Sequence, residues 1–336
     1  MDWNRFLQDP RARIAIGAGA LVVIGLVGWI VVANPFASPP APSPLAVVSP
    51  TPTRAPTATP SPTPPEPTPT ETPTPTPTHR PAALKDGRLT ILVLGSDSSI
   101  GRRHLRGGDE FLTDAITVVT VTANGRRMAL FSLPRDSASV RLPDGSIWTG
   151  KINSLTYYRG LETMRNTMEG LLGIRIDHYA MVSMDGFRTI VKAARGVTVH
   201  VPYRLHDIRC TIEAGLRDLN PERALCYARH RYSDSDYARG RRHQQLLLAL
   251  REKFLHGQIH LLELARGIGS LRTDIPWVDV PAFRDLLKHT GHAKITRIVF
   301  RPPRYTIFAG LAGARGWISI PDPFAIQAAV SDAIRR

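Results

Sequence analysis

The segment from Asn34 to Ala82 constrains the fold more than any other part of the chain. It contains 18 of the chain's 29 prolines, several of them in Thr-Pro repeats. Proline fixes φ and has no backbone N–H to donate, so such a segment is extended, solvated and polyproline-like, and builds no hydrophobic core. We therefore expect residues 34–82 to be a disordered Pro/Thr-rich linker. Residues 83–336 are then the folded domain, which is long enough to bury a sizeable core.

A run of twenty residues without a charged side chain, 14–33, precedes this linker. As a helix it would be about 30 Å long, which matches the hydrocarbon thickness of a bilayer. Three arginines lie before the run, and no further Lys or Arg occurs until Arg54. The positive-inside rule then predicts a cytoplasmic N-terminus (1–13), a single transmembrane helix (14–33) and an extracytoplasmic domain at the cell membrane. A cleaved signal peptide fits less well, because its apolar region is usually about 7–15 residues long.

The charge of the chain lies almost entirely in the folded domain. The formal net charge is +15, and residues 83–336 carry 38 basic and 24 acidic side chains. A domain this basic is expected to meet a polyanionic partner. The predicted extracytoplasmic location favours phosphates of lipids or of cell-surface polymers, and we expect no nucleic acid.

Cys210 and Cys226 would lie in an oxidising compartment. A disulfide between them would close a loop of about sixteen residues and add about 3 kcal/mol of stability in the chain-entropy treatment. Two buried free thiols are the alternative. A zinc site is not expected, because neither cysteine has a CxxC or CxxH partner.

Hydrophobic periodicity predicts strands that alternate with helices. Short runs rich in branched residues predict strands over 89–95, 115–123, 127–133, 179–183, 197–201 and 295–301. Helical spacing predicts helices over 161–172, 185–194, 238–254 and 324–334, and Asn220-Pro221 opens another that runs through Arg229. This order is typical of an α/β fold. The hairpin signal Asn124-Gly125 makes the central sheet mixed rather than purely parallel.

Two carboxylates stand at the ends of predicted strands. Asp97 follows the first strand in LGSDS, and Asp114 lies immediately before the second in FLTDA. A hairpin-like layout would bring these strand ends together. Paired carboxylates suit Mg²⁺, which takes few protein oxygens and leaves other positions to water and phosphate. Taken singly, each aspartate is better explained by an Asx turn or a cap.

Basic residues recur near the ends of predicted elements and along one helix. They are Arg135 in SLPRD, Arg229 and Arg231 in YARHR, and Arg239, Arg242 and His243 in the helix over 238–254. The last three are spaced i, i+3, i+4 and share one helix face. Guanidinium groups bind phosphate bidentately, and several of them with one Mg²⁺ can stabilise a pyrophosphate whose bond is breaking. A solvated basic face is the alternative for any single arginine.

The same residues lie in motifs that resemble the LytR-CpsA-Psr family of bacterial cell-envelope enzymes. From about Leu89 to Phe254 the matching pieces follow the family's order: LVLGSDS, TDAITVVTV, FSLPRDS, KINSLTYYRG, LLGIRIDHYAMVSMDGF, RGVTVHVP, LNPERALCYARHR and DYARGRRHQQ. The resemblance implies an α/β/α layered domain with an apolar pocket for a polyprenyl chain. It also implies transfer of a glycopolymer from a polyprenyl-diphosphate carrier to peptidoglycan, with formation of a phosphodiester in cell-wall assembly.

The resemblance assigns roles to individual residues. Asp97 and Asp114 would hold Mg²⁺ against the diphosphate and, with Arg135, would be catalytic. The residues that would bind the diphosphate are Arg135, Lys151, Arg229, Arg231, Arg239, Arg242 and His243. Lys151 is included only because it lies in the KIN motif of the resemblance.

Two positions depart from the family pattern. Leu112 stands where the family usually has an arginine before the Thr-Asp pair, so one phosphate contact is lost or comes from a preceding loop residue: Arg102, Arg103 or Arg106. His243 stands where the family usually has the first of two glutamines. It can still donate to a phosphate, with a charge that depends on pH.

Two other functions use the same residues. A non-catalytic binder of anionic wall polymers would use the basic face, but it would gain nothing from two carboxylates within it. A hydrolase, or pyrophosphatase, would cleave the same carrier with water as the acceptor. Only the acceptor distinguishes it from a transferase, so both stay open.

Overall fold

The computed structural model describes residues 84, 86–98, 112–231, 235–260 and 271–335. The predicted cytoplasmic segment (1–13), transmembrane helix (14–33) and linker (34–82) lie outside the described residues, as do Arg102, Arg103 and Arg106. Within the described ranges, no helix combines the length and the apolar character that crossing a bilayer requires.

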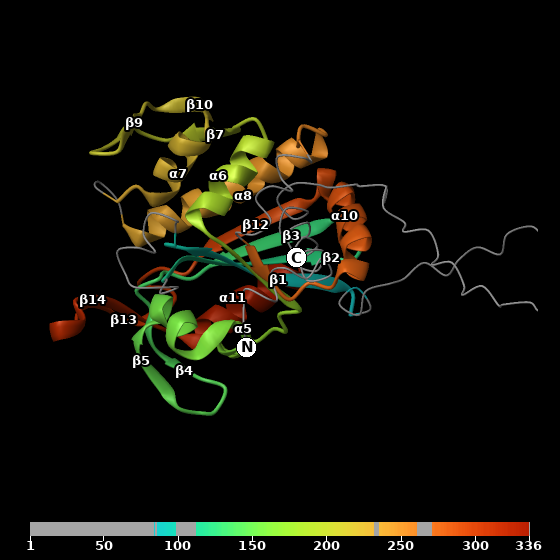
Figure 1. The fold of residues 1–336 in the computed structure, drawn as a ribbon. Coiled ribbons are helices and arrows are strands. Elements are labelled where there is room, and N and C mark those ends of the chain that lie inside the picture. Colours follow the sequence, from blue (N-terminus) through green and yellow to red (C-terminus); the bar gives the residue numbers. More distant parts are fainter. Residues whose placement is uncertain (1–83, 85, 99–111, 232–234, 261–270, 336) are drawn as a thin grey trace, which may run out of the picture. The chain divides into compact units, whose positions relative to one another are not determined.

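A six-stranded mixed sheet forms the centre of the described domain (Figure 1). In spatial order its strands are β11 (Leu271–Thr273), β6 (His178–Val182), β1 (Arg88–Ser96), β2 (Thr113–Thr122), β3 (Arg127–Ser132) and β12 (Lys294–Val299). β1 pairs with β6 in parallel and with β2 antiparallel, and β3 pairs with β2 antiparallel and with β12 in parallel. The mixed sheet agrees with the sequence prediction. The Asn124-Gly125 turn joins β2 to β3, and Gly125 has φ of +70°, which a residue with a Cβ rarely adopts.

Helices cover both faces of this sheet (Figure 1). One face carries α6 (Met184–Ala193), α7 (Pro221–Arg229), α8 (Asp236–Leu255) and α10 (Val280–Lys288), and the other carries α5 (Leu155–Leu172) and α11 (Pro323–Arg335). Successive strand residues point to opposite faces, so Leu89 and Ile91 of β1 join the first core, and Leu92 and Leu94 join the second. The result is a three-layered α/β/α arrangement.

Local sequence signals account for where several elements begin. The Asn220 side chain accepts a hydrogen bond from the backbone N–H of Arg223 at the start of α7, as its N-cap position predicts. Ser235 accepts from the N–H of Ala238 and caps α8. Helix α5 begins earlier than predicted, and Gly160, with φ of +84°, interrupts its helical geometry.

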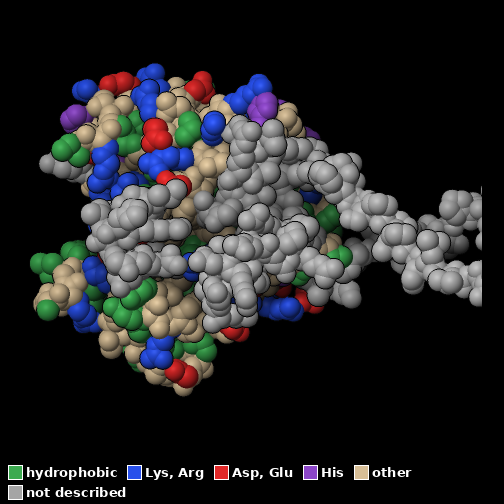
Figure 2. All heavy atoms as spheres, viewed as in Figure 1, with side chains coloured by type: hydrophobic (Ala, Val, Ile, Leu, Met, Phe, Trp, Pro, Cys, Tyr) green, Lys and Arg blue, Asp and Glu red, His purple; other side chains and the backbone are tan. Residues whose placement is uncertain are grey.

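Short paired strands surround the sheet and were not predicted. They form the pairs β4 (Ala138–Arg141) with β5 (Ile147–Lys151), β8 (Leu205–Asp207) with β9 (Cys210–Ile212), and β13 (Thr306–Leu311) with β14 (Trp317–Pro321), and β10 (Gly215–Leu219) pairs with the predicted strand β7 (Val197–Val201). Figure 2 shows hydrophobic side chains gathered over the β13–β14 hairpin, where Ile307 and Leu311 are exposed.

A disulfide joins Cys210 in β9 to Cys226 in α7, with Cα atoms 6.4 Å apart. The disulfide closes a loop between two cysteines that are 16 positions apart in the sequence. The bond ties the β8–β9 hairpin to the helix whose last residue is Arg229.

Candidate active site

The two aspartates at strand ends lie beside the same pocket. Asp97 follows β1, where its backbone N–H donates to the Leu112 carbonyl over 2.9 Å and its Oδ1 accepts from the Leu112 N–H over 2.8 Å. Asp114 lies at an irregularity in the β1–β2 ladder: Gly95 pairs with Ala115 and Ser96 pairs with Thr113. Asp114 is therefore the extra residue of a β-bulge. Bulges frequently redirect side chains next to active sites.

Glycine at position 95 relieves a close approach beside this bulge. A Cβ at Gly95 would lie 3.0 Å from the Cβ of Ala115, closer than carbon atoms normally approach. The absence of a side chain at Gly95 lets the two strands stay in register up to the bulge, and it leaves open space beside Ala115 at the pocket wall.

Arg135, after β3, connects Asp114 to the rest of the site. Its Nη1 donates to Asp114 Oδ1 over 2.8 Å. Burial would raise the pKa of Asp114, but Arg135, assisted by Arg239, holds that pKa below its ordinary value. Asp114 is therefore ionised at neutral pH.

A second pair of carboxyl groups lies on the other side of Arg135 and was missed in the sequence. Arg135 Nε is 3.6 Å from Asp236 Oδ2 and 3.9 Å from Asp136 Oδ2. Asp136 also pairs with Lys151 Nζ at 2.8 Å, and Asp236 Oδ1 pairs with Arg239 at 2.9 Å. The only sequence signal was adjacency: Asp136 follows Arg135, and Asp236 precedes Arg239 by one helical turn.

The surroundings of these two carboxyl groups favour ionisation of Asp136 and disfavour ionisation of Asp236. Burial and the neighbouring Asp136 raise the pKa of Asp236, whereas the pKa of Asp136, despite burial, is lowered by its hydrogen bond to Asp236 and by Lys151. Asp236 Oδ2 is buried and has no donor directed at it. A proton on Asp236 that is donated to Asp136 satisfies both groups.

The predicted arginines divide between the pocket and its surroundings. Arg229, half-buried at the end of α7, lines the pocket, and buried Arg239 lines a small polar hollow beside it. Arg231 is exposed, and its charge lowers the pKa of Arg239 further, beyond the larger effect of burial. Together with Arg135, these residues surround the two strand ends with positive charge.

The structure does not bring Arg242 to the pocket. Its Nη2 donates to the His230 carbonyl over 2.6 Å, and its guanidinium lies over the Tyr227 ring, 5.8 Å from the centroid. Helical spacing placed it on the same face as Arg239, but that face is packed against α7 and the following turn. Arg242 therefore holds the connection between α7 and α8.

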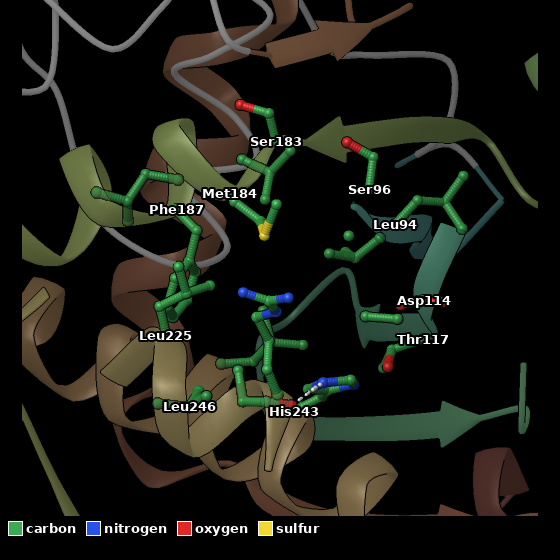
Figure 3. A pocket seen from close by; sticks show the side chains of 18 of the residues that line it. Leu94, Ser96, Asp114, Thr117, Ser183, Met184, Phe187, Leu225, His243 and Leu246 are labelled. Carbon is green, nitrogen blue, oxygen red and sulfur yellow. Dashed lines mark hydrogen bonds between the residues drawn. The ribbon is translucent and has the colours of Figure 1, made fainter. Parts of the chain in front are cut away.

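His243 lines the pocket but does not carry the pH-dependent charge that its sequence position suggested. Its Nε2 donates to the Ala228 carbonyl over 3.0 Å (the dashed line in Figure 3). Burial, followed by the charge of Arg239, lowers its pKa to about 3. The side chain is neutral at physiological pH, and its hydrogen donor is already used by the protein.

The pocket is an apolar cavity of about 130 Å³ with a polar rim. Figure 3 shows Phe187 of α6, Leu225 of α7 and Leu246 of α8 on one side, and Asp114 and Thr117 of β2 on the other. The adjoining polar hollow measures about 10 Å³, lies among Asp114, Arg135, Asp236 and Arg239, and is about the size of one water molecule. A long apolar group and a charged head group would therefore find adjacent, matching environments.

The donor set at the rim fits Mg²⁺. Asp97 and Asp114 present carboxylates from neighbouring strand ends, and hard oxygen ligands of this kind suit the ion. Elsewhere in the described part of the chain, Asp207, Cys210 and Cys226 bring potential ligand atoms within 4.8 Å of one another. The disulfide uses both sulfurs, so this second group does not form a metal site.

Comparison with known proteins agrees with this fold. The sequence model of the LytR_cpsA_psr family matches residues 66–304. Regulatory protein MsrR of Staphylococcus aureus (strain COL) is 30% identical over 199 residues, which cover 57% of this chain and 58% of MsrR. The polyisoprenyl-teichoic acid–peptidoglycan teichoic acid transferase TagV of Bacillus subtilis (strain 168) is 32% identical over 176 residues, 50% of this chain and 44% of TagV. The chain thus spans about half the length of the curated relatives it matches.

Solved structures share the fold. The crystal structure of B. subtilis TagV superposes with a TM-score of 0.59 at 24% identity and covers 74% of this chain and 96% of that one. A structure of TagT bound to LI-WTA gives a TM-score of 0.58 at 20% identity, with 76% and 93% coverage. With the family match covering most of the chain, the protein belongs to the LytR-CpsA-Psr family.

Proposed function

We propose that this chain is a membrane-anchored phosphotransferase that moves a glycopolymer from a polyprenyl-diphosphate carrier to a hydroxyl of peptidoglycan. The observation that carries the proposal is the junction of two environments: an apolar cavity opens onto a rim of two aspartates and several arginines. Family membership and the TagV relative support glycopolymer transfer in the cell wall.

The apolar cavity would take the first part of the prenyl chain. Its volume of about 130 Å³ is below the ~300–1,000 Å³ typical of pockets for small organic ligands. A prenyl chain would therefore separate α6, α7 and α8 from the sheet as it enters. Leu247, half-buried on α8, and Phe187 on α6 line this path.

The diphosphate would lie at the rim. Arg135, Arg229 and Arg239 would neutralise its oxygens and stabilise the charge that develops as the bridging bond breaks. Asp97 and Asp114 would hold Mg²⁺, which when bound would supply further charge neutralisation to the diphosphate.

The reaction exchanges one P–O bond for another. The acceptor hydroxyl oxygen forms a bond to the glycopolymer-bearing phosphorus, and the bridging P–O bond to the lipid phosphate breaks. The electron pair leaves with polyprenyl phosphate, and the hydroxyl proton passes to a carboxylate of the site. The polar hollow beside Arg135 has room for one hydroxyl-sized group at this point.

The predicted transmembrane helix at 14–33 and the linker at 34–82 complete the proposal. They would keep the domain outside the membrane surface while tethering it to the bilayer that contains the carrier. Such a carrier would enter the pocket from the outer leaflet.

The test uses the full-length chain in detergent with a short-chain polyprenyl-diphosphate saccharide, Mg²⁺ and peptidoglycan fragments. Mass spectrometry follows release of polyprenyl phosphate and labelling of the glycan, with chelator added in a parallel reaction. Arg135→Ala and Asp114→Asn should lose both signals, typically by 10²–10³-fold in kcat for a residue that stabilises transition-state charge. Arg175→Ala and Asp285→Asn are the matched controls, because both are exposed members of surface ion pairs.

Each outcome separates the competing functions. Release without labelling would indicate a hydrolase. Tight binding of the carrier with no release would indicate a non-catalytic binder. Full activity in the presence of chelator would remove Mg²⁺ from the proposal while leaving the transferase in place.

A further inference from the structure

A basic groove runs along the open edge of the central sheet. It measures about 860 Å³ and lies along β12, the last strand in the sheet order, between α8 on one face and α11 on the other. Its charged lining consists of five cations, Arg241, Lys294, Arg297, Arg301 and Arg304, against the single carboxylate of Asp332. All five cationic residues are exposed.

The cations of the groove outnumber its carboxylates by five to one. Within the described ranges, Arg241, Lys294, Arg301 and Arg304 form no ion pair. Arg297 donates to Gln244 Oε1 over 3.3 Å and to the Arg241 carbonyl over 3.0 Å, both neutral acceptors. Arg297 is exposed as a residue but its guanidinium is partly desolvated, which lowers its pKa, and the charge of Arg241 lowers that pKa further. Five cations against one carboxylate give the groove a positive potential that favours an anionic ligand.

Protection of the sheet edge explains only part of this pattern. Charged residues on an edge strand prevent it from pairing with another chain. That requirement accounts for Lys294 and Arg297, which lie on β12. It does not account for Arg241 on α8, or for Arg301 and Arg304 in the segment after β12.

The groove adjoins the candidate active site. Val299 lines both the groove and the polar hollow that contains Asp114, Arg135 and Asp236. Gly240 and Arg241, neighbours on α8, lie one in each lining. A chain attached to a phosphate at the active site would therefore meet the groove as it leaves.

We infer that the groove binds anionic repeat units of the polymer being transferred, as an extended subsite beyond the diphosphate. The inference rests on the proposed function and specifies its substrate: a polymer with phosphodiester-type charges along its length. The anionic units would supply negative charge to the groove.

The binding test uses the full-length chain in neutral detergent with fluorescent poly(glycerol phosphate) as the probe. The double variant Lys294→Gln/Arg301→Gln removes two groove charges. The matched control Arg195→Gln/Arg209→Gln removes two exposed charges elsewhere. We expect the groove variant to weaken binding about tenfold at low salt and to reduce the slope of log Kd against log salt by about 1–2, since each lost phosphate contact changes that slope by about one. The control variant and neutral dextran define the background.

Transfer is measured in a separate assay, so that failure of the proposed function can be distinguished from failure of the groove inference. With a carrier bearing a single uncharged disaccharide, the groove variant should transfer at the wild-type rate. With a carrier bearing a poly(glycerol phosphate) chain, its KM should rise about tenfold with kcat unchanged. Arg135→Ala should lose transfer from both carriers while still binding the free polymer.

Three results would overturn the inference. Equal polymer binding by the groove variant and its control would show that the groove is not the site. Groove-dependent binding to phosphatidylglycerol vesicles, without binding to the free polymer, would assign the surface to the membrane. An equal rise in KM for the charged and the uncharged carrier would place the effect at the diphosphate. Loss of all transfer in the wild type, with groove-dependent polymer binding intact, would refute the proposed function alone.

Discussion

The contact between Arg135 and Asp114 gives the sharpest energetic prediction. The two side chains meet at 2.8 Å, with 12% and 36% of each side chain exposed. Replacing them singly and together, as Arg135→Gln and Asp114→Asn, forms a double-mutant cycle that isolates their interaction. Arg135→Gln should be the more damaging single change, because Asp136 and Asp236 also lie within 4.0 Å of its guanidinium.

The size of the coupling follows from partial burial. Opposite unit charges about 4 Å apart attract by about 4 kcal/mol at an effective dielectric constant near 20. Solvent reaches Asp114, and fully exposed pairs couple by only about 0.2–1 kcal/mol. A hydrogen bond to a charged group contributes about 1.5–3 kcal/mol. We therefore expect a coupling of about 1.5 kcal/mol at pH 7.

The dependence on pH has a defined sign. Because Arg135 and Arg239 lower the pKa of Asp114 in the folded state, its stabilisation is fully present above the unfolded pKa of about 3.9. It is lost as the pH falls through the lower, folded-state value. The coupling at pH 5 should therefore equal that at pH 7.

Urea unfolding of the four proteins measures the cycle. The control cycle uses Arg284→Gln and Asp285→Asn on α10, a pair at 2.8 Å with 23% and 50% exposure, which should couple more weakly. A coupling at Arg135–Asp114 below about 0.5 kcal/mol, or one no larger than the control, would refute the ionic role assigned to Arg135.

Three further predictions concern protonation and cross-linking. Asp236→Asn should leave the free energy of unfolding at pH 7 within about 0.5 kcal/mol of wild type, because Asn mimics the protonated acid. Asp136→Asn should lower the free energy of unfolding by about 1–3 kcal/mol, because it removes the ionised partner of Lys151. Equal losses for the two variants in urea unfolding would contradict a proton shared between Asp136 and Asp236. The His243 ring should show no titration between pH 5 and 8 in NMR spectra, because its pKa is lowered to about 3. It should be the Nε2–H tautomer, because Nε2 donates to the Ala228 carbonyl. A titration midpoint near the ordinary value of about 6.5 would contradict the burial of the ring against Ala228. Cys210→Ser/Cys226→Ser should lower the free energy of unfolding by about 3 kcal/mol, as expected for a loop of this length. If chemical reduction of the wild type lowers its free energy of unfolding by the same amount, the effect belongs to the disulfide bond itself.

The regular elements could be predicted because their signals are local. A run of β-branched residues predicted β2, and an Asn-Pro pair predicted the start of α7, where Asn220 does cap the helix. The strands β8 and β9 escaped prediction, because three residues carry too little periodicity to separate a strand from a loop.

The site was only partly predictable for a different reason. Spacing showed that Arg239 and Arg242 share a helix face, but not that this face is packed, which sends Arg242 to the His230 carbonyl. The opposite pKa shifts of Asp136 and Asp236 arise from a meeting of residues one hundred positions apart. No local sequence pattern predicts that these two side chains meet, because their contact depends on how α8 packs beside the end of β3.

The β-bulge at Asp114 changes which face of the sheet the odd-numbered residues of β2 point to. Downstream of it, odd-numbered residues such as Ala115, Thr117 and Val119 face the helices α6 to α8. Upstream, Thr113 is also odd, yet it pairs with Ser96 and donates to the Asn153 carbonyl, on the side of α5. Within three residues the strand therefore serves both helical layers. Asp114 is in neither of the two hydrophobic cores, and its carboxylate instead meets Arg135 at the rim of the pocket.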